Sequence, residues 1–314
     1  MKVSRRVAGS LLVLGVAAVL GTEVFARAAL GLGDPPLYQA DPEIEYLLQP
    51  NQNVRRFGHL YHVNQYSMRS ADFPAAPQAG ERRVLVFGDS VVNGGARVDQ
   101  TRLATEQVRN RLGGAGGPAT VGNVAAFSWG PGNWLAYARR HGFFGADTVI
   151  VVVNAADYGD VPTFAPLDPD THPSRRPISA LVEGATRYLP EFLGLDSAAP
   201  LPPPAVREQD REASLRDFDE LLAMAQAAGV KVRLVQHFQR HELDAPETPA
   251  GLQAFARLCE QRQIPVVSLR DAEARSRDIA YLDEIHLTEA GQDILAEGLM
   301  TALDDSVTQL SAMR

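Results

Sequence analysis

The chain has 314 residues, 45% apolar residues and a formal net charge of −8 at pH 7. The negative charge excludes the basic face that nucleic-acid-binding proteins need, and the ordinary charged fraction of 22% excludes a disordered acidic chain. The single cysteine, Cys259, excludes an intrachain disulfide, and its place in a helical pattern predicts a small buried apolar residue. The length fits one large domain with appendages.

Residues 1–28 predict a segment for export. Lys2, Arg5 and Arg6 precede an apolar run from Val7 to Thr22, which predicts a cytoplasmic N-terminus and an exported body. The run is short for a spanning helix of about 20 residues and long for the core of a signal peptide. We favour an uncleaved anchor at the periplasmic face of the inner membrane. The alternative is cleavage near Ala26-Arg27-Ala28, which would release a periplasmic or secreted protein.

Residues 29–80 form a lead-in that is rich in proline, asparagine and aromatic residues and has no helical period. This composition predicts irregular chain and short strands packed on the main body. The stretch from Pro74 to Gly80 has the composition of a linker.

Residues 81–314 form the main body, in which strands and helices alternate. Runs such as VLVF at 84–87 and VIVVV at 149–153 are apolar on both faces, which is typical of central parallel strands covered by helices. In chain order the patterns predict strands at 83–87, 119–127, 147–153, 230–238 and 265–269, and helices at 101–112, 134–142, 211–229, 248–263 and 288–303. The predicted fold class is therefore α/β, a three-layer α/β/α sandwich with a mostly parallel central sheet. A proline-rich, polar stretch at about 155–205 interrupts the alternation and predicts a functional insertion.

Gly88-Asp89-Ser90 follows the first strand of the body, at the edge of the sheet where active residues gather in α/β proteins. Ser90 begins the next helix, so its hydroxyl is a candidate nucleophile and its backbone N–H a candidate oxyanion donor. The alternative is that Asp89 or Ser90 only caps that helix.

Asp283-x-x-His286 precedes the last helix and supplies a candidate base for this serine. A carboxylate three residues before a histidine can hold the ring Nδ1–H and favour the imidazolium that forms on proton transfer. The alternative is a histidine of a surface loop with an unrelated aspartate nearby.

Together these two motifs resemble the first and last blocks of the SGNH (GDSL-type) hydrolases, over about residues 83–303. The resemblance implies a flavodoxin-like sandwich and a catalytic triad of Ser90, His286 and Asp283, with no cofactor and no metal. The family's second block supplies an oxyanion-hole glycine, which NVAAFSWGPGN (123–133) would provide as Gly130; the alternative is a turn before a helix.

The third block of the family, Gly-x-Asn-Asp, is not reproduced. Aligning VVVNAADYGD on Asp157 puts Ala156 in the place of the oxyanion-hole asparagine. Either Asn154 or Asn133 takes over this role, or the hole uses two backbone donors. Losing one donor costs about 10²–10³-fold in rate.

Other polar residues are predicted near the site with less definite roles. Asp89, Asn133, Asp157 and His237 are candidate pocket residues. His237 and His241 have the spacing of metal ligands, but no third ligand follows at a suitable spacing, so no metal is expected. Trp129 and Trp134 either stack on a sugar or, as we favour, pack in the core. His172 is a less favoured candidate to face the site from the insertion.

The combined prediction is an exported serine hydrolase that acts on O-acyl esters, above all O-acetyl esters, of an envelope or secreted polysaccharide. The N-terminal helix and the lead-in resemble those of SGNH proteins associated with exopolysaccharide assembly, which implies other assembly proteins as partners beside the acylated polysaccharide and the membrane. Two alternatives stay open, a polysaccharide O-acyltransferase with the same triad and a non-catalytic binding or scaffold subunit. A lipid or thioester hydrolase is less favoured because the insertion is polar.

Overall fold

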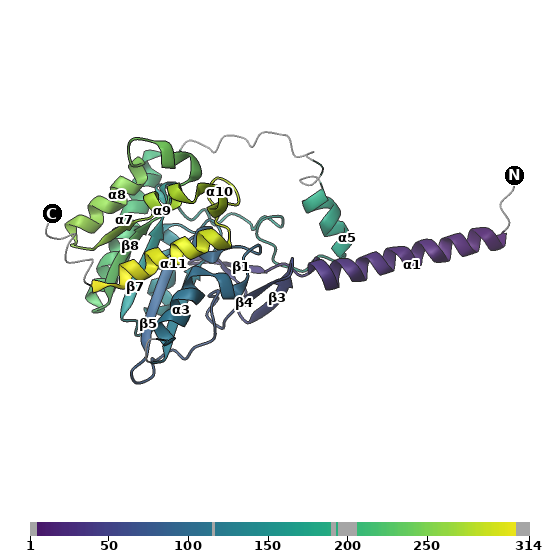
Figure 1. Ribbon diagram of the computed structural model, residues 1–314, viewed down its shortest axis with the longest axis horizontal. Helices are drawn as coiled ribbons and strands as arrows, with labels where there is room; N and C mark the ends of the chain where they lie inside the picture. The colour runs from purple at the N-terminus through teal and green to yellow at the C-terminus, as the bar shows by residue number, and fades with distance from the viewer. Residues whose placement is uncertain (1–4, 115–116, 190–192, 194–205, 306–314) are drawn as a thin grey trace.

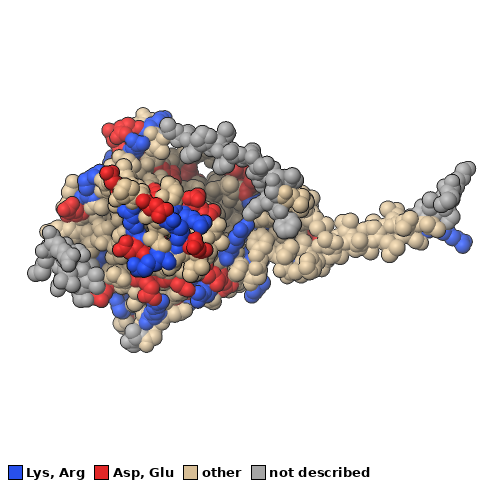
Figure 2. Space-filling model, turned by 45° about the horizontal axis from the view of Figure 1, so that its top comes forward, with Lys and Arg blue, Asp and Glu red and all other residues tan. Residues whose placement is uncertain are grey.

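The computed structural model describes residues 5–114, 117–189, 193 and 206–305. A layered body carries one long helix, α1 (Arg5–Leu30), which projects away from it (Figure 1). Among the described residues, α1 is the one helix that is long and apolar enough to cross a membrane. Figure 2 shows acidic and basic side chains interspersed over the body, whereas most of the length of α1 carries neither.

The centre of the body is a five-stranded sheet in which all strands run parallel. The strand order is β6-β5-β7-β8-β9, so the chain moves from β5 to one neighbour and then returns to the other side of β5. In open α/β sheets such a reversal leaves a crevice at the carboxyl ends of the strands. The strands are β5 (Arg82–Gly88), β6 (Ala119–Ala125), β7 (Thr148–Val153), β8 (Lys231–Gln236) and β9 (Val266–Ser268).

Helices cover both faces of this sheet, which confirms the predicted three layers. One face carries α3 (Ala104–Gly114) and α11 (Glu289–Leu303), which contact each other. The other carries α4 (Pro131–His141), α7 (Glu208–Ala227) and α8 (Ala250–Gln261). The short elements of the body are α2 (Ser90–Asn93), η1 (Gln100–Arg102), η2 (Ala155–Asp157), η4 (Arg240–Asp244), α9 (Arg270–Arg275) and α10 (Arg277–Ala280).

The lead-in contains short strands, as its composition predicts, and these pair into two antiparallel hairpins. They consist of β1 (Tyr38–Asp41) with β2 (Glu45–Leu48), and β3 (Gln52–Arg56) with β4 (His59–Val63). The Tyr46 hydroxyl donates to the Phe127 carbonyl, 2.6 Å away, so the first hairpin lies against the loop that follows β6. The buried Arg83 guanidinium donates to the carbonyls of Pro74 and Ala75, both 3.0 Å away, which fixes the linker to the body.

The insertion after β7 contains a short helix, α5 (Ala180–Glu183), which continues into a wider turn, η3 (Gly184–Tyr188). Both lie beside the body end of α1 (Figure 1). Residues 190–192 and 194–205 of the predicted insertion lie outside the described residues.

Candidate active site

Ser90 is placed by the sharp corner between β5 and α2. The Asp89 carboxylate caps α2 by accepting a hydrogen bond from the Val91 N–H (2.8 Å), so the capping interpretation holds for Asp89. A Cβ atom at Gly88 would lie 2.3 Å from the Val92 side chain, so only glycine fits at this corner. The Ser90 hydroxyl is left facing a cavity.

His286 and Asp283 meet Ser90 at this corner. His286 Nε2 lies 2.9 Å from Ser90 Oγ, and His286 Nδ1 lies 2.7 Å from Asp283 Oδ2. The first distance is within the range expected for a serine and its general base. Two motifs nearly two hundred positions apart in the chain therefore converge, as the sequence predicts.

The Asp283 carboxylate also fixes the shape of its own loop. Its Oδ1 accepts hydrogen bonds from the backbone N–H groups of Ile285 (2.9 Å) and His286 (2.8 Å). Partial burial by itself raises the pKa of Asp283, but these two donors and the His286 ring outweigh it, and the pKa lies below the ordinary value. Asp283 is therefore ionised at neutral pH and keeps the proton of His286 on Nδ1.

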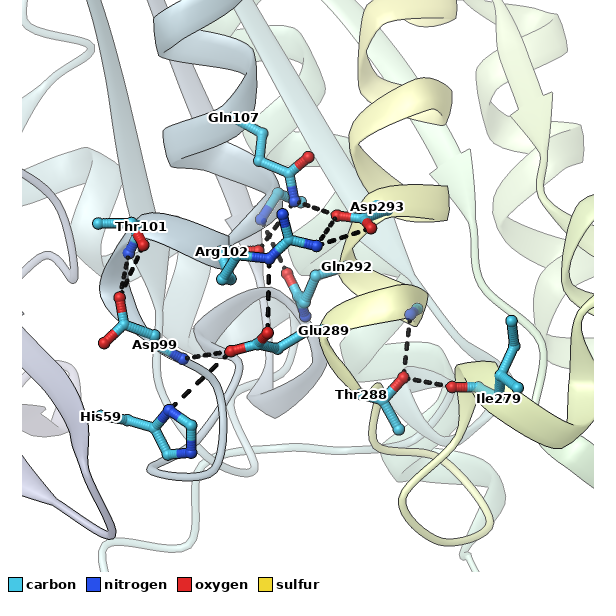
Figure 3. A network of polar contacts seen from close by, with 12 residues as sticks. His59, Asp99, Thr101, Arg102, Gln107, Ile279, Thr288, Glu289, Gln292 and Asp293 are labelled. Atoms are coloured by element: carbon cyan, nitrogen blue, oxygen red, sulfur yellow. Dashed lines mark hydrogen bonds and ion pairs between the residues drawn. The ribbon is translucent and has the colours of Figure 1, made fainter.

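A polar network holds the start of α11, the helix that follows the His286 loop (Figure 3). Thr288 caps this helix by accepting from the Gly291 N–H at 3.1 Å. Arg102 of η1 makes an ion pair with Asp293 in which one guanidinium nitrogen, Nη2, lies 2.9 and 2.8 Å from the two carboxylate oxygens. The Gln107 side chain of α3 donates to the same carboxylate at 2.7 Å, so Asp293 ties α11 to both η1 and α3.

The cavity over Ser90 has a volume of about 330 Å³. Aromatic side chains dominate its apolar wall, and the Phe127 ring centre lies 6.1 Å from that of His286. The lining consists of Phe57, Ser90, Gly94, Gly95, Ala96, Arg97, Phe127, Tyr188, Leu282, Asp283, His286 and Leu287. Sequence reasoning missed Phe57 and Tyr188, because they come from the lead-in and the insertion, where no motif marks them.

The predicted role of Gly130 as an oxyanion donor is wrong for this structure. The Gly130 N–H donates to Asn133 Oδ1, 2.9 Å away, and Gly130 begins α4. The Asn133 amide in turn donates to the Ile44 carbonyl (2.8 Å) and to Glu45 (3.1 Å), so Asn133 has no free donor either. Gly130-Pro131-Gly132-Asn133 is thus a helix start, the alternative that the sequence left open.

Asn154 lies behind the nucleophile and does not line the cavity. Its side chain donates to Asp89 Oδ2 (3.0 Å), and its backbone N–H donates to Asp157 Oδ2 (2.7 Å). Asp89 and Asp157 are also buried and absent from the cavity lining, so their prediction as pocket residues is wrong. The amide of Asn154 is directed at Asp89, which contradicts its predicted role as an oxyanion donor. Among the predicted oxyanion donors, the Ser90 N–H is the one for which the described residues supply no acceptor.

Burial determines the charge of these acids. Burial raises the pKa of Asp89, and burial together with the Asp89 charge raises the pKa of Asp157 well above its ordinary value. Burial, Asp89 and Glu45 raise the pKa of Asp160 to about 7. The region behind Ser90 therefore resists holding several negative charges at once.

His237 supports the catalytic loop from behind and does not line the cavity, contrary to the prediction. Its Nδ1 lies 2.6 Å from Glu273 Oε1 and its Nε2 lies 2.9 Å from the Ile285 carbonyl. Burial alone lowers the pKa of His237, but Glu273 outweighs it and the pKa is raised. Both ring nitrogens then donate, and one of them holds the residue next to His286.

The remaining candidates have structural surroundings. Trp129 and Trp134 are fully buried in the core. His172 packs on the rings of Tyr38 and Tyr46, with centres 4.7 and 4.6 Å away, and its Nε2 lies 3.3 Å from the Phe127 carbonyl. Within the described residues there is no cluster of three His, Cys, Asp or Glu side chains suited to a metal ion.

Comparisons with known proteins give structural neighbours only, since no family model and no curated protein matches the chain. A two-domain esterase active on acetylated mannans is 15% identical, with a TM-score of 0.47; the match covers 73% of this chain and 51%, about half, of that one. An acetyl xylan esterase is 12% identical, with a TM-score of 0.45, covering 71% of this chain and 100% of that one. A protein of the lipolytic G-D-S-L family from Veillonella parvula is 11% identical, with a TM-score of 0.42, covering 70% and 96%.

We expect Asn133→Ala to destabilise the protein without slowing catalysis. The substitution leaves the Gly130 N–H and the Ile44 carbonyl buried without a side-chain partner, a loss of about 1–3 kcal/mol. The unfolding temperature in detergent should fall, while kcat for p-nitrophenyl acetate stays at the wild-type value. Asn110→Ala, on the exposed surface of α3, is the matched control. If the unfolding temperature is unchanged and kcat falls about 10²-fold, Asn133 is an oxyanion donor after all.

We expect Asp157→Asn to stabilise the protein increasingly as the pH rises. Because the pKa of Asp157 is raised on folding, its contribution to stability is full below the ordinary value of 3.8 and is lost as the pH rises through the raised value. The neutral amide does not ionise, so it avoids this loss. The unfolding temperature of the variant minus that of wild type should therefore be larger at pH 8 than at pH 5. If the difference in unfolding temperature becomes smaller from pH 5 to pH 8, the pKa of Asp157 is not raised on folding.

Proposed function

We propose that this protein is a serine hydrolase of the SGNH type that cleaves O-acyl esters. The observation that carries the proposal is the continuous relay from Asp283 through His286 to Ser90, with distances of 2.7 and 2.9 Å, at the wall of a cavity. A serine, a base and an orienting carboxylate in this order are the requirements for nucleophilic acyl transfer.

In the proposed reaction, Ser90 Oγ attacks the ester carbonyl carbon while His286 Nε2 takes the hydroxyl proton. Asp283 stabilises the imidazolium that results, and the Ser90 N–H donates to the oxyanion of the tetrahedral intermediate. Collapse of the intermediate breaks the bond to the leaving alcohol, which receives the proton from His286. Water, deprotonated by His286, then attacks the acyl-enzyme and releases the carboxylic acid and free Ser90.

The proposed substrates are O-acetyl groups on an envelope or secreted polysaccharide. A cavity of about 330 Å³ suits a small acyl group, and the aromatic side chains Phe57, Phe127 and Tyr188 offer flat apolar faces to a sugar ring. If a sugar hydroxyl replaces water in the second step, the same geometry makes an O-acyltransferase. The two activities are distinguished by measuring whether acetate is released into solution or transferred to an added oligosaccharide.

We also propose that α1 is retained as an anchor at the periplasmic face of the inner membrane. The Glu23 carboxylate accepts hydrogen bonds from the backbone N–H groups of Ala180 and Leu181, and Ala26 packs against Ala180. Cleavage near Ala26-Arg27-Ala28 would remove these contacts from the folded body. N-terminal sequencing of the mature protein tests this directly.

Ser90→Ala should remove hydrolysis of p-nitrophenyl acetate and labelling by a serine-directed fluorophosphonate. Loss of the nucleophile typically lowers kcat by about 10⁶-fold, because no other side chain replaces it. Ser174→Ala, on the exposed part of the insertion, is the matched control and should keep both activities. If the wild-type protein is unlabelled and as inactive as Ser90→Ala, the chain is a non-catalytic binding or scaffold protein.

Asp283→Asn should reduce kcat less severely than Ser90→Ala. The Asp283 side chain is 54% exposed, so water takes over part of its stabilisation of the imidazolium. The loss should fall within about 10²–10⁴-fold, the upper figure being that of a fully buried triad aspartate. This loss in kcat is measured from pH–rate profiles of both proteins at saturating substrate. Activity equal to that of wild type would show that Asp283 does not orient His286.

A further inference from the structure

The segment after Pro177 presents apolar side chains to the outside. Ile178 is 100% exposed, Val182 60% and Leu189 46%, and Leu193 further on is 55% exposed. Val182 lies in α5 and the exposed Ala185 in η3, while Ile178 precedes and Leu189 follows these elements, at spacings of three or four residues. The opposite side of the same helix is buried, with Ala180 and Glu183 inside. The exposed side chains of Ile178, Val182, Ala185, Leu189 and Leu193 therefore form an apolar face that no other described residue covers, and these five residues are called the 178–193 face.

This helix is seated on the body end of α1. Glu23 of α1 accepts hydrogen bonds from Ser179 Oγ (2.8 Å), Ala180 N (2.8 Å) and Leu181 N (3.0 Å). Arg27 donates to the Ile178 carbonyl at 2.9 Å, so both ends of the contact are fixed. Figure 1 shows α5 beside the point where α1 leaves the body.

The length of the apolar run of α1 determines the depth of this contact. The uncharged residues from Val7 to Thr22 span about 24 Å as a helix, against about 30 Å for the hydrocarbon core of a bilayer. Glu23 follows directly, and a carboxylate with hydrogen-bonded partners belongs at the boundary between lipid and water. α5 is bound to Glu23 and therefore lies at the same depth.

We propose that the 178–193 face rests on the phospholipid surface beside α1, as an interfacial helix. The inference depends on the anchoring role proposed above for α1. The helix is seated on α1, whose own apolar side chains face outward, with Leu11, Leu14 and Leu20 each more than half exposed. Arg175 precedes it and is exposed, which suits the anionic headgroups of the bilayer, while the neighbouring Arg176 makes an ion pair with Asp34 at 2.6 Å.

This placement has a consequence for the active site. Tyr188, on the inner side of the same helix, lines the cavity over Ser90, and it packs with Phe57 against the cluster that contains Ala26 of α1. Seating the 178–193 face on lipid therefore brings the cavity to the membrane surface. The enzyme then acts on esters of glycan chains presented at that surface.

The test uses the full-length protein in vesicles of phosphatidylcholine and phosphatidylglycerol whose acyl chains are dibrominated, because bromine quenches tryptophan on contact. The reporters are Val182→Trp in the 178–193 face, Leu14→Trp in α1 and Glu260→Trp on α8, at the end of the body away from α1. The native Trp129 and Trp134 are buried, and the wild-type signal is subtracted. Val182→Trp and Leu14→Trp should lose emission relative to unbrominated vesicles, and Glu260→Trp should not.

A second measurement places charge in the face. Ile178→Trp in the Val182→Asp, Leu189→Asp background should lose less emission to brominated lipid than Ile178→Trp alone. Hydrolysis of soluble p-nitrophenyl acetate should be the same in all variants, and it reports on the proposed activity separately from membrane contact. The proposal is overturned if Val182→Trp keeps its emission while Leu14→Trp loses it. An unquenched but blue-shifted Val182→Trp spectrum would also overturn it, because a protein and not lipid would then cover the face. If Leu14→Trp is unquenched, α1 is not in the bilayer, and the anchoring role on which the inference depends is wrong.

Discussion

The fully buried amide of Gln292 sets the geometry on which the site depends. Its nitrogen donates to the Val91 carbonyl in α2, and its oxygen accepts from the Ala104 N–H at the start of α3, both at 2.9 Å. Val91 follows Ser90 directly, and Gln292 lies in the first turn of α11, close behind His286 in the chain. One side chain therefore fixes the register between the helix that carries Ser90 and the helix that follows its base. The Arg102–Asp293 pair adds a second tie on the outside of the same contact (Figure 3).

The parts of this arrangement that depend on local sequence could be predicted. Uninterrupted apolar runs such as VLVF and VIVVV identify strands buried on both faces, and parallel topology then brings their carboxyl ends to one edge. Ser90 is positioned by such a strand end. His286 is positioned by a loop whose shape Asp283 fixes with hydrogen bonds to residues two and three positions later, which is a short-range interaction.

The errors concern residues whose partners are distant or compete with one another. Gly130 has the residue type of an oxyanion donor, but Asn133, three positions on, takes its N–H because both belong to the start of a helix. Asn154 follows a strand end, where an oxyanion donor is expected. Its amide hydrogen is nevertheless accepted by Asp89, which follows the neighbouring strand. The aromatic wall needs Phe57 and Tyr188, which no spacing in the sequence relates to Ser90. Such choices depend on the packing of segments far apart in the chain.

The hydrogen bonds between Glu23 and the 179–181 turn impose an order on biogenesis. The donors at Ser179 and Ala180 are synthesised more than 150 positions after their acceptor. In a chain exported as proposed above, Glu23 would cross the membrane before these donors are made, with its carboxylate hydrated. Closure of the contact removes that water at a late stage, when the insertion arrives. On that proposal, closure of the contact links α1 to completion of the body, and a chain stalled before this point would leave both surfaces of the contact exposed.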